Sequence, residues 1–131
     1  MNYGEFMKDV RERTGLDKQQ AERAVRATLN TLAQRLAGGE PHDLASQLPE
    51  ELKETVELTA DAGAGVRWHA DDFVAKVAER EGCPPARARE HVKAIFAALR
   101  DAITPGEFDD VTSQLDRSYE ALLPQGAGVG S

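Results

Sequence analysis

An internal repeat constrains the fold of this chain more than any other sequence feature. When the sequence is shifted by 67 residues, residues 6–52 align with residues 73–119 without a gap, and 15 of the 47 aligned positions are identical. The identical pairs include Gly15 with Gly82 and Gly39 with Gly106, and glycine at such positions is typical of helix ends. The chain therefore contains a duplicated unit, and its fold must accommodate two similar segments.

Both units have the apolar spacing of α-helices, since their hydrophobic residues recur three and four positions apart. In the first unit the apolar stripes are Tyr3, Phe6, Met7 and Val10, then Ala21, Val25, Thr28, Leu29, Leu32 and Leu36. In the second they are Phe73, Val74 and Val77, then Ala88, Val92, Ile95, Phe96, Leu99 and Ile103. Each unit thus begins with a short amphipathic helix and continues with a longer one.

Polar residues and glycine predict where these helices begin and end. Asn2 with Glu5, and Asp17 with Gln20, have the spacing of a capping box at a helix N-terminus. Gly15 lies between the two helices, where a left-handed residue ends the first. These signals predict helices that begin near residues 3 and 18.

Prolines predict a difference between the two units. Pro84 and Pro85 lie where the long helix of the second unit begins, a position that tolerates proline. Pro49 restricts Leu48 to extended geometry, so the end of the first unit is expected to break into two short helical segments. Asp116 stands at the aligned position of the second unit and permits a continuous helix there.

These elements predict an all-α fold in which two tandem repeats of three to four helices pack with pseudo-two-fold symmetry into one helical bundle. Residues 1–123 form a single domain in this prediction, with repeat units at 2–58 and 69–123 and a linker at 59–67. One unit alone buries only one stripe per helix, which makes a marginal core, so we expect the units to fold together. Residues 124–131, rich in glycine, are predicted to be disordered.

The end of each unit carries a family resemblance. Residues 39–49 read GEPHDLASQLP and residues 106–115 read GEFDDVTSQL. This ending, after a helix with Phe6 and a second helix rich in alanine and arginine, resembles the bacterial domain-of-unknown-function family 2267 from about residue 6 to residue 123. The resemblance implies a small, helical, cytoplasmic bacterial protein without an established activity, and it supplies no catalytic residues. The second copy departs from the pattern at Asp116.

Charge and composition exclude several classes of function. With 16 Lys plus Arg against 23 Asp plus Glu, the net charge of −7 disfavours binding to nucleic acid or to an anionic membrane. One cysteine, Cys83, excludes an internal disulfide, and no stretch approaches the roughly 20 apolar residues of a membrane span. We therefore expect a soluble cytoplasmic protein with no nucleic-acid or membrane partner.

The duplicated polar element at the end of each unit has two interpretations. Its candidate ligands for a divalent metal are Glu40, Asp43 and Gln47 with Glu107, Asp110 and Gln114. These side chains can bind a cation if the two copies meet across the pseudo-two-fold axis. In the simpler interpretation, they hydrogen-bond free backbone groups where the chain turns between helices.

The histidines and the cysteine also have a chemical and a structural interpretation. His42, His69 and His91 lack the spacing of a metal site, and Asp71 is expected to cap a helix beginning near Asp72. Cys83 precedes the helix start at Pro84, where the helix dipole would lower its thiol pKa and make it a redox candidate. Alternatively Cys83 is a buried structural thiol, since its aligned partner is Leu16.

The charge distribution within each unit favours an interaction function. Residues 8–35 carry seven basic and four acidic side chains, whereas residues 40–61 carry one basic and seven acidic ones. The second unit repeats this polarity. Residues 67–100 carry seven basic and five acidic side chains, and residues 101–120 carry one basic and six acidic ones. These charges either form ordinary solvated faces or attract a charged protein or another copy of the chain.

The sequence thus predicts a non-enzymatic module that binds another protein or itself. It contains no nucleophile elbow, phosphate-binding glycine loop or dinucleotide fingerprint, so we expect neither catalytic residues nor a cofactor. The alternative function is a small-ligand or divalent-metal-binding domain that uses the duplicated Gly-Glu-x-x-Asp-x-x-Ser-Gln-Leu element.

Overall fold

Helices account for most of the chain in the computed structural model, which describes residues 1–130. They are α1 (Tyr3–Thr14), α2 (Lys18–Arg35), α3 (Glu40–Gln47), α4 (Glu50–Glu57), α5 (Ala70–Glu81), α6 (Pro85–Ala102), α7 (Pro105–Ser113) and the 3₁₀ helix η1 (Arg117–Leu122). Residues 1–130 contain no strand, only an isolated bridge between Ala37 and Ala64. The predicted all-α class is therefore confirmed, and no helix in this part of the chain is long and apolar enough to cross a membrane.

The capping signals place the first helices as the sequence predicts. Asn2 and Asp17 each accept a hydrogen bond from the backbone N–H three residues later, at 2.8 Å in both cases, and both capping boxes are complete. Gly15 ends α1 in the left-handed conformation with φ 74°. The same spacing of 67 residues relates the bounds of α1 to those of α5, and the bounds of α2 to those of α6.

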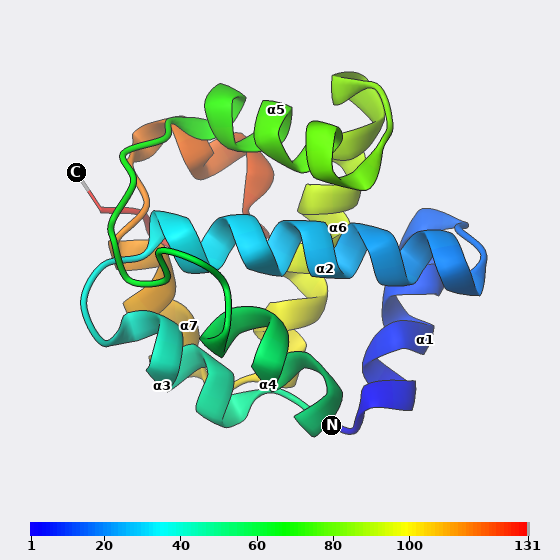
Figure 1. The fold of residues 1–131 in the computed structure, drawn as a ribbon, viewed down its shortest axis with the longest axis horizontal. Coiled ribbons are helices and arrows are strands. Elements are labelled where there is room, and N and C mark those ends of the chain that lie inside the picture. Colours follow the sequence, from blue (N-terminus) through cyan, green and yellow to red (C-terminus); the bar gives the residue numbers. More distant parts are fainter. Residues whose placement is uncertain (131) are drawn as a thin grey trace.

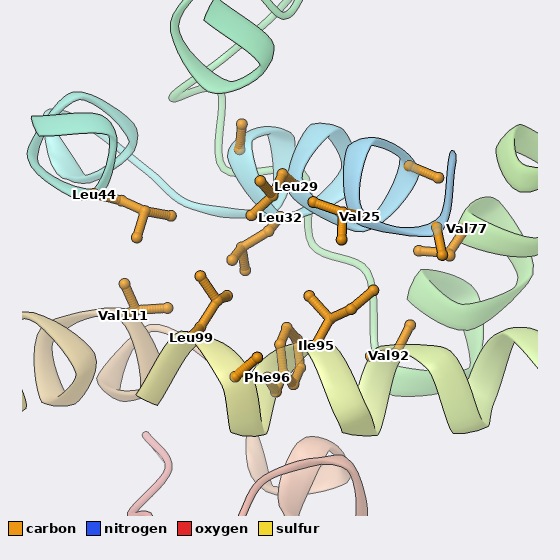
Figure 2. Packing of buried hydrophobic residues seen from close by; sticks show 14 of the residues in the cluster. Val25, Leu29, Leu32, Leu44, Val77, Val92, Ile95, Phe96, Leu99 and Val111 are labelled. Atoms are coloured by element: carbon orange, nitrogen blue, oxygen red, sulfur yellow. The ribbon is translucent and has the colours of Figure 1, made fainter. Parts of the chain in front are cut away.

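The two long helices, α2 and α6, cross at the centre of the molecule (Figure 1). α5 lies on one side of α2 and α4 on the other, while α1 packs against α6. Figure 2 shows Leu29 and Leu32 of α2 facing Ile95 and Leu99 of α6, all of them buried. Each such side chain contributes about 1.5–3 kcal/mol when removed from water. The apolar stripes of the two halves thus form one continuous core.

Two helix boundaries in the second half differ from the sequence predictions. The continuous helix permitted by Asp116 does not form, because α7 ends at Ser113 and η1 begins at Arg117. The Asp116 carboxylate accepts a hydrogen bond from Ser118 N–H at 2.9 Å and so caps a new turn instead of continuing the old one. Likewise α5 begins at Ala70, and Asp72, not Asp71, accepts a hydrogen bond from the His69 N–H.

The break at Pro49 forms as predicted. α3 ends at Gln47, Leu48 is extended with φ −87° and ψ 156°, and α4 begins at Glu50. α3 therefore turns back at Pro49 into α4 and at the same time lies against α7. This arrangement brings the duplicated polar elements of the two units close together.

The segment between the two halves is held against the end of α2. The N–H groups of Gly63, Gly65 and Val66 donate to the carbonyls of Ala33, Leu36 and Gln34 at 3.2, 3.2 and 2.9 Å. The predicted linker at 59–67 is thus a hydrogen-bonded strap along the last turn of α2.

Residues 124–130 lie against α7 and α6. The Gly130 N–H donates to the carbonyl of Leu115 at 2.8 Å, and Arg100 donates to the carbonyl of Gln125 at 3.2 Å. The predicted disorder of residues 124–131 contrasts with these contacts as far as Gly130, while Ser131 lies outside the described residues.

Candidate metal-binding sites

Two buried glutamates meet where α3 lies against α7. Glu40 is the first residue of α3, and Glu107 lies in the first turn of α7, which Thr104 caps. Only 8% of Glu40 and 7% of Glu107 is exposed to solvent. Carboxylate oxygens of Glu40, Glu107 and the exposed Asp110 all lie within 4.8 Å of one another. The contact between the two units therefore contains a cluster of three carboxylates.

One oxygen of each buried carboxyl group lacks the hydrogen bond that normally accompanies burial. Among residues 1–130, no donor from another group reaches Glu40 Oε1 or Glu107 Oε2. Unpaired negative charge out of contact with water is costly, so such a pair needs a proton or a cation between its oxygens. Burial, followed by the hydrogen bond and negative charge of Glu107, raises the pKa of Glu40 to about 8. This effect outweighs the helix N-terminus, which would favour the ionised form.

The other residues of the duplicated element lie outside this cluster. Gln47 Oε1 accepts a hydrogen bond from the Thr104 N–H at 2.8 Å, and Gln114 Oε1 accepts one from the Ala37 N–H at 2.7 Å. Each glutamine thus binds a backbone group just beyond the long helix of the opposite unit. Asp43 is exposed and contributes negative charge near Glu40. The structure therefore brings together Glu40, Glu107 and Asp110 from the six candidates, but not the other three.

A second cluster lies at the turn between α5 and α6. Glu81 is the last residue of α5, Gly82 turns the chain with φ 81°, and Cys83 directly precedes α6. His91, on the buried face of α6, reaches back toward both residues. One ligand atom from each of Glu81, Cys83 and His91 lies within 4.8 Å of the other two.

The Glu81 and His91 side chains are only 6% exposed, and Glu81 Oε2 lies 2.6 Å from His91 Nδ1. The two groups are nevertheless not aligned as a hydrogen bond, since His91 Nδ1 and Glu81 Oε1 lack hydrogen-bond partners in the described part of the chain. Buried polar atoms without partners are uncommon in folded proteins and call for a specific explanation.

The pKa of Cys83 differs from the sequence prediction. Burial, followed by the hydrogen bond and negative charge of Glu81, raises this pKa to about 11, with Arg87 acting in the opposite direction. The expected lowering by the start of α6 is therefore wrong, because Cys83 is half-buried beside a carboxylate. In the metal-free protein the thiol stays protonated near neutral pH, which disfavours the predicted redox role.

The three histidines lie at separate sites, and each faces a carboxylate. His42 Nδ1 lies 3.2 Å from Glu57, and His69 Nδ1 lies 2.9 Å from Asp116. Both of these histidines are exposed, unlike His91. His91 lies three residues after Ala88 and four before Ile95, and this place on the apolar stripe of α6 is the sequence signal that could have indicated its burial.

An open pocket of about 700 Å³ adjoins the second cluster. His91 forms part of its wall, together with Pro84, Arg87 and Glu90 from the second half and Arg13, Thr14 and Leu16 from the first. The pocket therefore lies beside one member of the second cluster, His91.

Comparison with protein families identifies a match over nearly the whole chain. A family model described as "Uncharacterized conserved protein (DUF2267)" matches residues 3–122, nearly the whole chain. This match confirms the resemblance predicted from residues 39–49 and 106–115. No curated protein matches the chain.

Proposed function

Because the chain belongs to the DUF2267 family, which has no characterised activity to transfer, we propose from its geometry that it is a non-enzymatic helical module that binds a divalent cation. The observation that carries this proposal is the pair of buried glutamates, Glu40 and Glu107, whose carboxyl groups lie close together and each have one oxygen without a hydrogen-bond partner among residues 1–130. The cation takes the place of the proton between them. The predicted bacterial and cytoplasmic setting stays a prediction of the family resemblance.

The donor set favours a hard cation such as Ca²⁺, Mg²⁺ or Mn²⁺. Carboxylate oxygens are the ligands these ions prefer, and water completes their coordination shells. Glu40 and Glu107 provide buried ligands, and Asp110 provides a third carboxylate on the solvent side. Since Glu40 carries a proton below its pKa of about 8, cation binding releases a proton and strengthens as the pH rises.

The proposal includes an approximate two-fold relation between the halves, with the cation close to the axis. Two contacts between aligned positions and one reciprocal pair of hydrogen bonds support this relation. Glu40 meets its counterpart Glu107, and in Figure 2 Leu44 of α3 faces its counterpart Val111 of α7. The two glutamine contacts are also reciprocal, because Ala37 and Thr104 are separated by the repeat spacing. Such a relation explains why two acidic residues lie together, since a residue near the axis contacts the aligned residue of the other half.

A thermal unfolding experiment with added cations tests the proposal. Binding to the folded state alone raises stability by about 2.7 kcal/mol when the free ligand concentration is 100 times Kd. We expect at least one of Ca²⁺, Mg²⁺ and Mn²⁺ to raise the Tm of the wild-type chain, with a larger increase at pH 8.5 than at pH 6.5. Glu40→Gln and Glu107→Gln should abolish the increase.

Glu54→Gln is the matched control, because Glu54 is an exposed glutamate of α4 outside the cluster. This variant should keep the wild-type response to the cations. The proposal is wrong if none of the three cations changes the wild-type Tm at either pH, or if Glu54→Gln loses the response as fully as Glu40→Gln.

The surface charge of α4 favours a second function, association with another protein or with another copy of the chain. Glu50, Glu51, Glu54 and Glu57 are all exposed on this short helix, and Leu58 directly after it is 75% exposed. An acidic surface beside an apolar side chain suits a basic partner, and the encounter rate would fall with added salt. Sedimentation velocity at low and high salt tests self-association, which Glu50→Lys and Glu54→Lys together should weaken.

A further inference from the structure

We propose that Glu81, Cys83 and His91 form a binding site for a transition-metal ion, with Zn²⁺ as the favoured ion. This site is separate from the Glu40 and Glu107 site, because it lies at the turn between α5 and α6 and uses different donor atoms. It has no counterpart in the first half, where the aligned residues are Thr14, Leu16 and Ala24.

The donor set selects the class of metal. A thiolate, an imidazole nitrogen and a carboxylate oxygen together match the ligands of Zn²⁺, whereas Mg²⁺ and Ca²⁺ prefer oxygen alone. The three groups come from two helices and one turn, and Gly82 with φ 81° places Cys83 beside Glu81. The Cys83 N–H donates to the Ala78 carbonyl at 3.1 Å, which fixes the backbone at this turn.

The geometry needs only a small adjustment to receive the ion. Bond lengths of about 2.0–2.3 Å in a tetrahedral site separate the ligand atoms by roughly 3.3–3.8 Å. The ligand atoms of the cluster already lie within 4.8 Å of one another. The pair of Glu81 Oε2 and His91 Nδ1, now 2.6 Å apart, must separate by roughly 1 Å to admit the metal.

The unpartnered atoms point to an ion rather than to a simple ion pair. His91 Nδ1 and Glu81 Oε1 are buried without hydrogen bonds among the described residues. A metal ion coordinated between the two side chains would give these buried polar groups a partner. On binding, the Cys83 thiol loses its proton to solvent, and the metal–sulfur bond replaces the sulfur–hydrogen bond.

The pocket beside His91 leaves room for a fourth ligand. Three protein ligands and one open position are typical of zinc sites that exchange water or a small molecule, in contrast to closed structural sites with four protein ligands. The pocket is open to solvent and is lined by His91, Arg87 and Glu90, and in this proposal it supplies the water that occupies the fourth position.

Cobalt substitution provides a direct test, because Co²⁺ replaces Zn²⁺ and reports a bound thiolate by a charge-transfer absorption band. The full-length chain is freed of metal with a chelator, titrated with Co²⁺ and then with Zn²⁺. We expect one Co²⁺ per chain with a thiolate band, which Zn²⁺ displaces, and one proton released per Zn²⁺. Cys83→Ser should abolish the band, and His91→Gln should weaken Zn²⁺ binding at least tenfold.

The other two histidines provide matched controls. His42→Gln and His69→Gln each remove a histidine that faces a carboxylate outside the cluster, so both variants should bind Zn²⁺ like the wild type. Should His91→Gln fail to fold, the wild-type chain gives an independent readout, since Zn²⁺ must slow the reaction of Cys83 with a thiol reagent. Absence of a thiolate band together with an unchanged thiol reaction rate overturns the proposal.

Discussion

At the scale of single residues, burial decides the chemistry of the carboxylates and of the thiol. Glu40 and Glu107 are chemically identical to exposed glutamates, yet their position between two helices buries them and leaves one oxygen of each without a hydrogen-bond partner among residues 1–130. The desolvation that raises the pKa of Glu40 also raises that of Cys83, because both groups lose the water that stabilises their charged forms. Each group therefore holds a proton, which a metal ion bound at the proposed sites would replace.

The raised pKa of Glu40 predicts a specific dependence of stability on pH. Its value in the folded state, about 8, exceeds the ordinary value of 4.5, so the folded state binds the proton more tightly than the unfolded state does. The resulting stabilisation is complete below pH 4.5 and is lost as the pH rises through 8. Glu40→Gln, which cannot ionise, should therefore lose less stability than the wild type between pH 5 and pH 9.

Thermal unfolding in metal-free buffer at these two pH values measures this difference, with Glu54→Gln as the control that keeps the wild-type profile. An identical pH dependence in Glu40→Gln and in the wild type would show that Glu40 does not hold its proton in the folded state. This comparison does not depend on cation binding, because the metal-free buffer contains a chelator that removes divalent ions.

At the scale of the elements, the strap between the two halves contains a glycine that no other residue can replace without strain. Gly63 has φ 81°, and a Cβ atom added there would lie 2.7 Å from the carbonyl oxygen of Gly38. Gly63→Ala thus combines a left-handed backbone with a steric clash against the backbone, whereas Gly106 in the first turn of α7 has open space around it.

We expect Gly63→Ala to destabilise the protein by about 1–3 kcal/mol, the usual cost of a strained backbone conformation. Gly106→Ala should leave the stability unchanged or raise it slightly, because alanine favours the helix and restricts the unfolded chain. Chemical denaturation of the two variants measures both effects. An equal free energy of unfolding for the two variants would show that the strap accommodates the Cβ atom at residue 63 without loss of stability.

At the scale of the whole molecule, the two halves share one core. The stripe of α2 faces the stripe of α6, and each half covers apolar surface that the other half would expose if it folded alone (Figure 2). Trp68, which lies between the halves, packs against this core, and its carbonyl accepts hydrogen bonds from Arg35 and Tyr119 at 2.9 and 2.7 Å. The molecule should therefore unfold as one unit.

Leu29→Ala, a change in the first half only, tests this cooperativity. Truncating a fully buried leucine costs about 2–5 kcal/mol through lost burial and the remaining cavity. We expect the loss of helix by circular dichroism and the change in Trp68 fluorescence to follow one transition, shifted equally in the variant. Two separate transitions in either protein would show that the halves unfold independently.

The helices and most of their boundaries could be predicted from the sequence, because capping boxes, glycine and proline act within a few residues of their own positions. The sequence also determined the all-α class and the family, since the periodicity of apolar residues and the GE–D–SQL element are both local patterns. The helix break at Asp116 differs from the prediction of a continuous helix, because this carboxylate also faces His69 and Arg35, which are distant in sequence.

Which polar residues come into contact depends on how the helices pack. Glu40 and Glu107 stand 67 positions apart, and they come together because α3 packs against α7. Glu81, Cys83 and His91 have no recognised ligand spacing, and the turn between α5 and α6 determines their proximity. A site depends on distances across the fold and on the exclusion of water, and neither follows from local residue preferences. The packing of the two halves therefore brings Glu40 to Glu107, while the packing of α5 against α6 brings Glu81 and Cys83 to His91.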